Sequence, residues 1–267
     1  MKELNVVMEK TLKEFMRNKM ELIWTFLVPI SFLIIIPLMY GDTPIGLMAS
    51  LKGALTLTMM NFLIAFVGQA NLAGSIASDR AKGLYLKMSS MPVNPWKEGI
   101  GRILALWIFS FIGTIIVILV GLLYGANFAY DFSVILGVLA VGSIILLMTS
   151  GTGLIIASLL KNESAATHTG VAVTLLVYFL GGMAFSYSNL PPFMQIFARI
   201  HPLSSMNSMM IYLLEGEAIA GYNPLTLEQI IPNIIIAVLT FIIGLMLYSK
   251  SCWKINKIPF FHLHKRA

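Results

Sequence analysis

Six long apolar runs dominate the sequence and limit what the chain can fold into. A helix that crosses the hydrocarbon of a bilayer needs about 20 mostly apolar residues. The runs that meet this requirement are Leu22–Tyr40, Leu51–Ala77, Ile103–Gly125, Phe132–Leu160, His168–Tyr187 and Ile230–Tyr248. Charged residues make up only 11% of the chain, against about 25% in soluble domains. These features predict an all-α integral membrane protein with a six-helix transmembrane domain at residues 22–249.

The basic residues are distributed unequally between the segments that join these runs. Of the 18 Lys and Arg residues, all but Lys52 and Arg199 fall on one side. Because Lys and Arg are enriched in cytoplasmic loops, we expect a multi-pass protein of the cell membrane with both termini in the cytoplasm. The net charge of +6 follows from this bias, so no nucleic-acid partner is expected.

Two polar segments flank the transmembrane domain. Residues 1–21 have the periodicity of an amphipathic helix that lies in the cytoplasmic membrane interface. Its apolar face contains Leu4, Met8, Leu12 and Phe15. This helix either only anchors the chain on lipid or also contacts a partner protein. Residues 250–267 form a basic cytoplasmic tail.

The external segment 188–229 is long and only weakly polar. Pro191 and Pro192 are well placed to start a short helix, which His201 and Pro202 would end. A second short helix is predicted from Ser204 to Leu214. We expect the two helices to dip back into the outer leaflet, where their backbone would be covered by protein. The alternative is an amphipathic pair that lies on the surface.

The cytoplasmic segment 78–102, between the second and third runs, contains the most polar internal stretch, DRAKGLYLKMSSMPVNPWKEG. It is longer than a simple connector between two helices requires, and Pro92 and Pro95 interrupt it. Its basic residues either dock onto a partner protein or bind anionic lipid headgroups.

Motifs for catalysis or metal binding do not occur. The single Cys252 excludes a disulfide framework, and the four histidines are in neither an HExxH nor a comparable motif. The stretch GLYLKMSS lacks the second Gly and the Lys-Ser/Thr pair of a Walker A sequence. The middles of the six runs hold no Asp, Glu, Lys or Arg of the kind that proton-coupled pumps use. We therefore predict a chain that is not an enzyme and binds no metal.

Two stretches resemble the membrane subunit of type-2 ATP-binding-cassette (ABC) exporters, the type-2 permease family. The first is the charged pair Asp79-Arg80, followed by Lys82-Gly83-Leu84 and a run that ends at Met91-Pro92-Val93. The family's usual first residue is Glu, so Asp79 shortens that side chain. The second stretch is KNESAATHTG with the later GGMAFSYSNLPPFMQIFARIHPLSSMNSMM.

The resemblance implies a permease that works with a separate ABC ATPase subunit and a second permease copy, as a homodimer in the lipid bilayer. ATP and Mg would then bind to the partner ATPase, and this chain would hold no cofactor. The expected cargo of this efflux system is amphipathic or lipid-linked, such as a drug, an antibiotic or a glycan. The alternative is a self-contained six-helix channel or scaffold without an ATPase.

Three groups of site residues follow from the resemblance. The residues expected to couple to the ATPase are Asp79, Arg80, Lys82, Gly83, Leu84, Lys87 and Pro92. An external gate is expected at Gly181, Gly182, Leu190, Pro191 and Pro202. Candidates to line the path are Asn61, Gln69, Thr174 and Tyr178.

Overall fold

The computed structural model describes residues 2–41, 44–91, 93–128, 132–185 and 187–253. These residues form helices and turns and no β-strand. The long helices are α2 (Lys19–Leu38), α3 (Ile45–Phe66), α6 (Pro95–Leu123), α7 (Phe132–Leu159), α8 (Glu163–Leu180) and α12 (Leu227–Ser251). The others are α1 (Lys2–Arg17), α4 (Leu72–Ala81), α5 (Leu84–Ser89), α9 (Pro192–Ile200), α10 (Pro202–Glu215), α11 (Glu217–Ala220), the π-helix η1 (Val67–Asn71) and the 3₁₀ turn η2 (Tyr187–Asn189).

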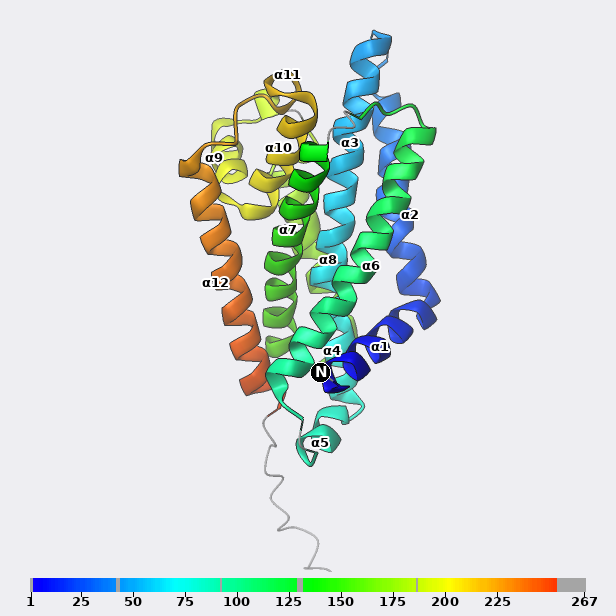
Figure 1. Cartoon of the computed structure of the whole chain (residues 1–267), viewed down its shortest axis with the longest axis vertical. Coiled ribbons are helices and arrows are strands. Elements are labelled where there is room, and N and C mark those ends of the chain that lie inside the picture. Colours follow the sequence, from blue (N-terminus) through cyan, green and yellow to red (C-terminus); the bar gives the residue numbers. More distant parts are fainter. Residues whose placement is uncertain (1, 42–43, 92, 129–131, 186, 254–267) are drawn as a thin grey trace, which may run out of the picture.

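The long helices run side by side along the longest axis of the molecule (Figure 1). Helix α1 crosses the lower part of α6, and α5 is the lowest of the labelled elements. Helices α9, α10 and α11 cover the opposite end. We call these the α5 end and the α10 end. The first helix and the end of α12 both lie toward the α5 end, as expected for termini on one side of a membrane.

Within the described residues, five helices are long and apolar enough to cross a membrane: Lys19–Leu38, the continuous Ile45–Ala81, Pro95–Leu123, Val134–Leu159 and Leu227–Ser251. The predicted fifth run, His168–Tyr187, differs from the others. Its helix, α8, begins earlier at Glu163 and ends at Leu180, and its first half is polar. Five of the six predicted spans are thus confirmed by length and composition, and a sixth span at α8 stays a prediction.

The central element of the bundle is the continuous rod of α3, η1 and α4. In its most apolar window 83% of residues are buried, against 22% for α2 and for α12. Neighbouring helices approach it and one another through glycines. A Cβ atom at Gly170 of α8 would lie 2.6 Å from Cα of Ala70, and one at Gly151 of α7 would lie 2.7 Å from Cα of Phe241. Small residues at such contacts allow backbones in a membrane to pack closely.

The polar segment between the second and third spans is shorter than predicted. Helix α4 continues to Ala81, and α6 already begins at Pro95. The segment between these helices is therefore 82–94, whereas the sequence predicted 78–102. The start of α6 has a clear local cause: the side chain of Asn94 accepts a hydrogen bond from the backbone N–H of Trp96 at 2.9 Å, and Pro95 occupies the first helical position. On either side of this connector, Asp79 of α4 and Glu98 of α6 both pair with Arg102 inside the protein.

The first external helix begins where the prolines predict, whereas the second begins at Pro202, a residue expected only to end the first helix. Helix α9 starts at Pro192 after Pro191, and α10 starts at Pro202. Helix α10 begins two residues before the predicted start at Ser204 and ends one residue after the predicted end at Leu214. Helix α10 is packed into the bundle, since Leu203, Met206 and Met210 are buried. Its depth in a membrane stays a prediction.

Candidate functional site

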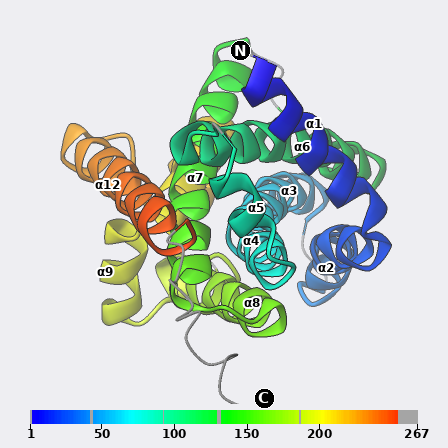
Figure 2. The same ribbon diagram turned by 90° about the horizontal axis from the view of Figure 1, so that it is seen from below.

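Helix α5 and its flanking turns form the most protruding part of the α5 end. Gly83 has φ +70°, a left-handed conformation that favours glycine and turns the chain out of α4. Seen from below, α5 lies beneath α4, with α9 and α12 on one side and α1 and α2 on the other (Figure 2). Lys82 and Lys87 are exposed, and Leu86 and Met91 are 53% and 57% exposed. The outer surface of this segment is therefore apolar and basic.

Tyr85 fixes the inner face of α5 to the bundle. It is only 3% exposed, and its ring packs edge-on against Tyr248 and Trp253, with centroids 5.9 and 5.5 Å away. Its hydroxyl oxygen lies 3.2 Å from that of Tyr248, within hydrogen-bonding distance. Burial raises the pKa of the Tyr85 phenol well above its usual value, so this anchor is uncharged.

A charge cluster, buried except for Lys10, lies directly behind Tyr85. Arg102 of α6 donates from Nε to Glu98 Oε1 at 2.5 Å, from Nη1 to Ser75 Oγ at 3.1 Å, and from Nη2 to Asp79 Oδ2. Lys10 of α1 donates to the same oxygen of Asp79 at 2.6 Å. The charge cluster, Lys10, Asp79, Glu98 and Arg102, thus holds two acids and two bases, and Arg102 is fully buried.

The charge cluster joins four helices at one point. Tyr248 of α12 donates its hydroxyl proton to Glu98 Oε2, while the acids and bases come from α1, α4 and α6. The Arg102 guanidinium lies 5.9 Å from the centre of the Tyr85 ring. Because removing one partner of a buried ion pair costs about 3–5 kcal/mol, these helix ends and α5 are expected to move together.

Arg80 binds the ends of α7 and α12. Its Nη1 donates to the carbonyl of Ala157 at 3.4 Å, and its Nη2 donates to the carbonyl of Ser251 at 3.2 Å. These carbonyls end α7 and α12, where a cation offsets the negative end of the helix dipole.

The residues predicted to couple to an ATPase therefore separate into two groups. Asp79 and Arg80 point inward, Gly83 forms the turn, and Leu84 is half-buried. Lys82 and Lys87 remain on the surface, and Pro92 lies outside the described residues. The sequence analysis missed Tyr85, Glu98, Arg102 and Tyr248. The spacing of Glu98 and Arg102, four residues apart at a helix start, is a signal that could have found part of the charge cluster.

Helix α1 is amphipathic, as predicted, but its apolar face covers protein. Phe15 is 3% exposed and stacks on Phe109 of α6 at 5.7 Å. Leu4, Met8 and Leu12 are half-buried on the same side, whereas Met16 on another side is 63% exposed. Anchoring of α1 on lipid stays a prediction.

The predicted external gate lies at a tight turn after α8. Gly182 has φ +71°, and a side chain at this position would collide with Leu190, just as one at Gly181 would collide with Ser204. Leu190 and Pro202 are buried, whereas Pro191 is exposed. These residues do meet at one place, and their role as a gate stays a prediction.

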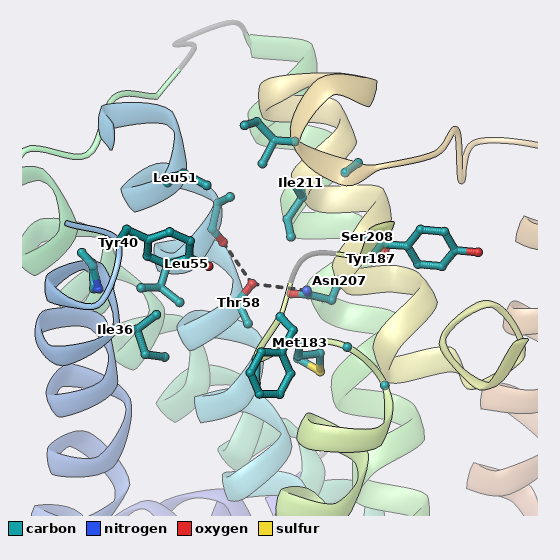
Figure 3. Close-up of a pocket in the computed structure, with 18 of the residues that line it drawn as sticks. Ile36, Tyr40, Leu51, Leu55, Thr58, Met183, Tyr187, Asn207, Ser208 and Ile211 are labelled. Carbon is teal, nitrogen blue, oxygen red and sulfur yellow. Dashed lines mark hydrogen bonds between the residues drawn. The ribbon is translucent and has the colours of Figure 1, made fainter. Parts of the chain in front are cut away.

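Beside this turn is a cavity of about 270 Å³ at the α10 end (Figure 3). Its walls come from α2, α3, α10, α11 and the turn after α8. Most of the lining is apolar, including Ile36, Leu55 and Ile211, and its polar groups include Thr58, Asn207 and Ser208. The side chain of Asn207 donates to Thr58 Oγ1 at 3.2 Å.

The four predicted path-lining residues lie in the interior of this chain. Asn61 donates to Asn207 Oδ1 at 2.8 Å, so it sits just behind the cavity. Thr174 donates to Gln69 Oε1 at 2.7 Å, and Tyr178 packs edge-on against Phe62 at 5.3 Å. All four are buried, and their role in lining a path stays a prediction.

The match to a known family covers the helices that build both ends. The family model described as ABC-2 type transporter matches residues 2–214, from α1 to the last turn of α10. No match was found among curated proteins. The matched region contains α5, the whole charge cluster and the turn at Gly181, and it is most of the chain. The chain therefore belongs to the ABC-2 type transporter family, and it is a multi-pass membrane protein and a permease subunit of an ABC transporter.

Proposed function

We propose that this permease exports an amphipathic or lipid-linked substrate across the cell membrane, driven by a separate ABC ATPase that docks onto α5. The α5 end then faces the cytoplasm, with both termini on that side, and the α10 end faces outward. The observation that carries the proposal is α5 itself: a short helix that protrudes from the bundle and is fixed to it by a buried anchor.

The surface of α5 suits a protein partner. Leu86 and Met91 offer apolar side chains, and Lys82 and Lys87 flank them with positive charge. Such a surface fits a recess that has an apolar floor and an acidic rim. Force applied to α5 would pass through Tyr85 to the charge cluster, and from there to α1, α4, α6 and α12.

The α10 end supports the proposed substrate class. Its cavity is lined mainly by apolar side chains, with neutral hydroxyl and amide groups, which suits an amphipathic molecule better than a small ion. ATP and Mg would be held by the partner. A second copy of this permease would complete the transporter, and the two copies would face each other across the path.

The test is to co-express the chain with its candidate ATPase and purify the complex through a tag on the permease. The double variant Leu86→Ser with Lys87→Glu changes only the outer face of α5. Its matched control, Met39→Ser with Lys250→Glu, makes similar chemical changes at exposed positions outside α5, at the end of α2 and the end of α12. Asp79 and Arg80 are left unchanged because they are structural.

We expect the α5 variant to lose ATPase copurification and substrate-coupled ATP turnover by at least about tenfold, as for the centre of an interface. The control should behave like the native chain. If both variants retain the ATPase equally, docking on α5 is wrong. If no ATPase copurifies with the native chain, a self-contained channel or scaffold explains the protein better.

A further inference from the structure

A second cavity, separate from the external one, lies between α5 and the ends of neighbouring helices. It has a volume of about 200 Å³. The polar side chains in its lining come from Arg80, Ser89, Lys161, Ser251 and Trp253. These residues belong to α4, α5, the turn before α8 and the end of α12.

The charge in this cavity is entirely positive. Neither Arg80 nor Lys161 forms an ion pair with any residue that the structure describes. Arg80 uses two of its five N–H donors on the carbonyls of Ala157 and Ser251. The indole Nε1 of Trp253 is buried and has no acceptor among the described residues. The cavity therefore offers donors and positive charge without a matching anion.

A neighbouring cavity at the same end shows the difference. It is lined by Lys10, Lys13, Arg17 and Lys82, but also by Glu14, Glu21 and Glu163. There the protein supplies its own negative charge. The cavity at Arg80 and Lys161 lacks any Asp or Glu in its lining, so an anion would have to come from outside the described chain. Residues 254–267 do not offer such a side chain, since they hold four Lys or Arg and no Asp or Glu.

The surroundings favour a lipid as the source of that anion. Trp253 follows the span Leu227–Ser251, in the position where tryptophans lie among lipid headgroups. Within three turns of the same end of α12, Ile242, Ile243 and Met246 are exposed. These side chains give α12 an exposed apolar surface for acyl chains, and the residues at the end of the same helix, Ser251 to Trp253, line the cationic cavity.

We infer that this cavity binds the phosphate group of an anionic phospholipid. The headgroup would accept hydrogen bonds from Arg80, Lys161 and the Trp253 indole, with Ser89 of α5 at its edge. One lipid would then link α5 to the ends of α4, α7 and α12. Binding of this lipid does not require the ATPase, so it is tested on the permease alone.

The experiment uses the full chain purified in mild detergent and mixed with equal amounts of phosphatidylglycerol and phosphatidylcholine. Retained lipid is counted by native mass spectrometry. The native chain should keep phosphatidylglycerol in preference. Lys161→Gln should lower its retention about fivefold, as expected for one basic residue near a headgroup. The matched control Lys250→Gln removes an exposed lysine at the end of α12 that does not line the cavity, and it should change nothing.

A second variant keeps the test decisive if Lys161→Gln does not fold. Trp253→Phe removes the indole N–H and keeps an aromatic ring against Tyr85, and it too should lower retention of phosphatidylglycerol. Equal retention of the two lipids by the native chain, or equal losses for Lys161→Gln and Lys250→Gln, would overturn the proposal. So would displacement of phosphatidylglycerol by excess inorganic phosphate, because the site would then belong to a soluble anion.

Discussion

The two ends of this permease are held together by different chemistry. At the α5 end, Asp79, Glu98 and Arg102 are the buried members of the charge cluster, and Arg102 makes hydrogen bonds to three side chains. At the α10 end, the buried polar contacts are between neutral groups such as Asn61, Asn207 and Thr58, beside glycines and a cavity. The comparison indicates that the α5 end, where the ATPase would act, is rigid. At the α10 end the side-chain packing can rearrange.

The energies behind this contrast have different origins. A buried charge that loses its partner is left in a medium of low polarity, which costs several kcal/mol. A neutral hydrogen bond contributes only about 1 kcal/mol. Small displacements of α5 are therefore expected to be transmitted through the charge cluster, whereas the α10 end can exchange one set of contacts for another.

The largest expected effect on stability comes from breaking the ion pairs of the charge cluster. Arg102→Met leaves Asp79 and Glu98 buried with only Lys10 as a counter-charge, so it should lower the stability of the purified chain by about 3–5 kcal/mol. Denaturant unfolding in detergent, followed by tryptophan fluorescence, measures this loss. The matched change at the other end is Asn207→Leu, for which we expect about 1–2 kcal/mol. An equal or larger loss for Asn207→Leu would contradict the contrast between the ends.

An intermediate effect should appear on acidification, and it belongs to the α10 end. Burial lowers the pKa of His201 to about 4, and its Nδ1 has no hydrogen-bond partner among the described residues. Below a pH of about 6.5 the unfolded chain takes up a proton that the folded chain excludes. Stability attributable to His201 is thus complete above pH 6.5 and falls by up to about 3 kcal/mol as the pH approaches 4.

The measurement is the free energy of unfolding as a function of pH for the native chain and for His201→Gln. The variant should lose this part of the pH dependence. His168→Gln, which changes an exposed histidine of α8, serves as the control and should retain it. Identical pH profiles for His201→Gln and the native chain would show that His201 is not the group responsible.

The smallest effect tests the neutral contacts directly. A double-mutant cycle with Asn61→Ala and Asn207→Ala should give a coupling energy of about 1 kcal/mol, because the pair shares one hydrogen bond at 2.8 Å. Unfolding of the two single variants, the double variant and the native chain provides the cycle. A coupling energy near that of a buried ion pair would remove the difference between the two ends.

The sequence was sufficient for the features that depend on local pattern. Apolar run length predicted five spans, prolines predicted where α9 begins, and apolar periodicity predicted α1. It failed where long-range pairing decides. Asp79 was assigned to a surface segment because its partners, Lys10 and Arg102, lie on other helices. The contact of Glu98 with Tyr248 was missed because Tyr248 is distant in sequence. Tyr85 was missed for the same reason, since its burial depends on the end of α12.

The most direct test of the central claim is a cross-link between α5 and the ATPase. In a Cys252→Ser background, Leu86→Cys places one reactive thiol on the outer face of α5, and Met39→Cys places one at an exposed position at the α10 end. With a short bifunctional reagent in membranes that contain both subunits, we predict a permease–ATPase product for Leu86→Cys and none for Met39→Cys. An active complex in which Leu86→Cys reacts with the reagent but never joins the ATPase would contradict the proposal that α5 receives the force.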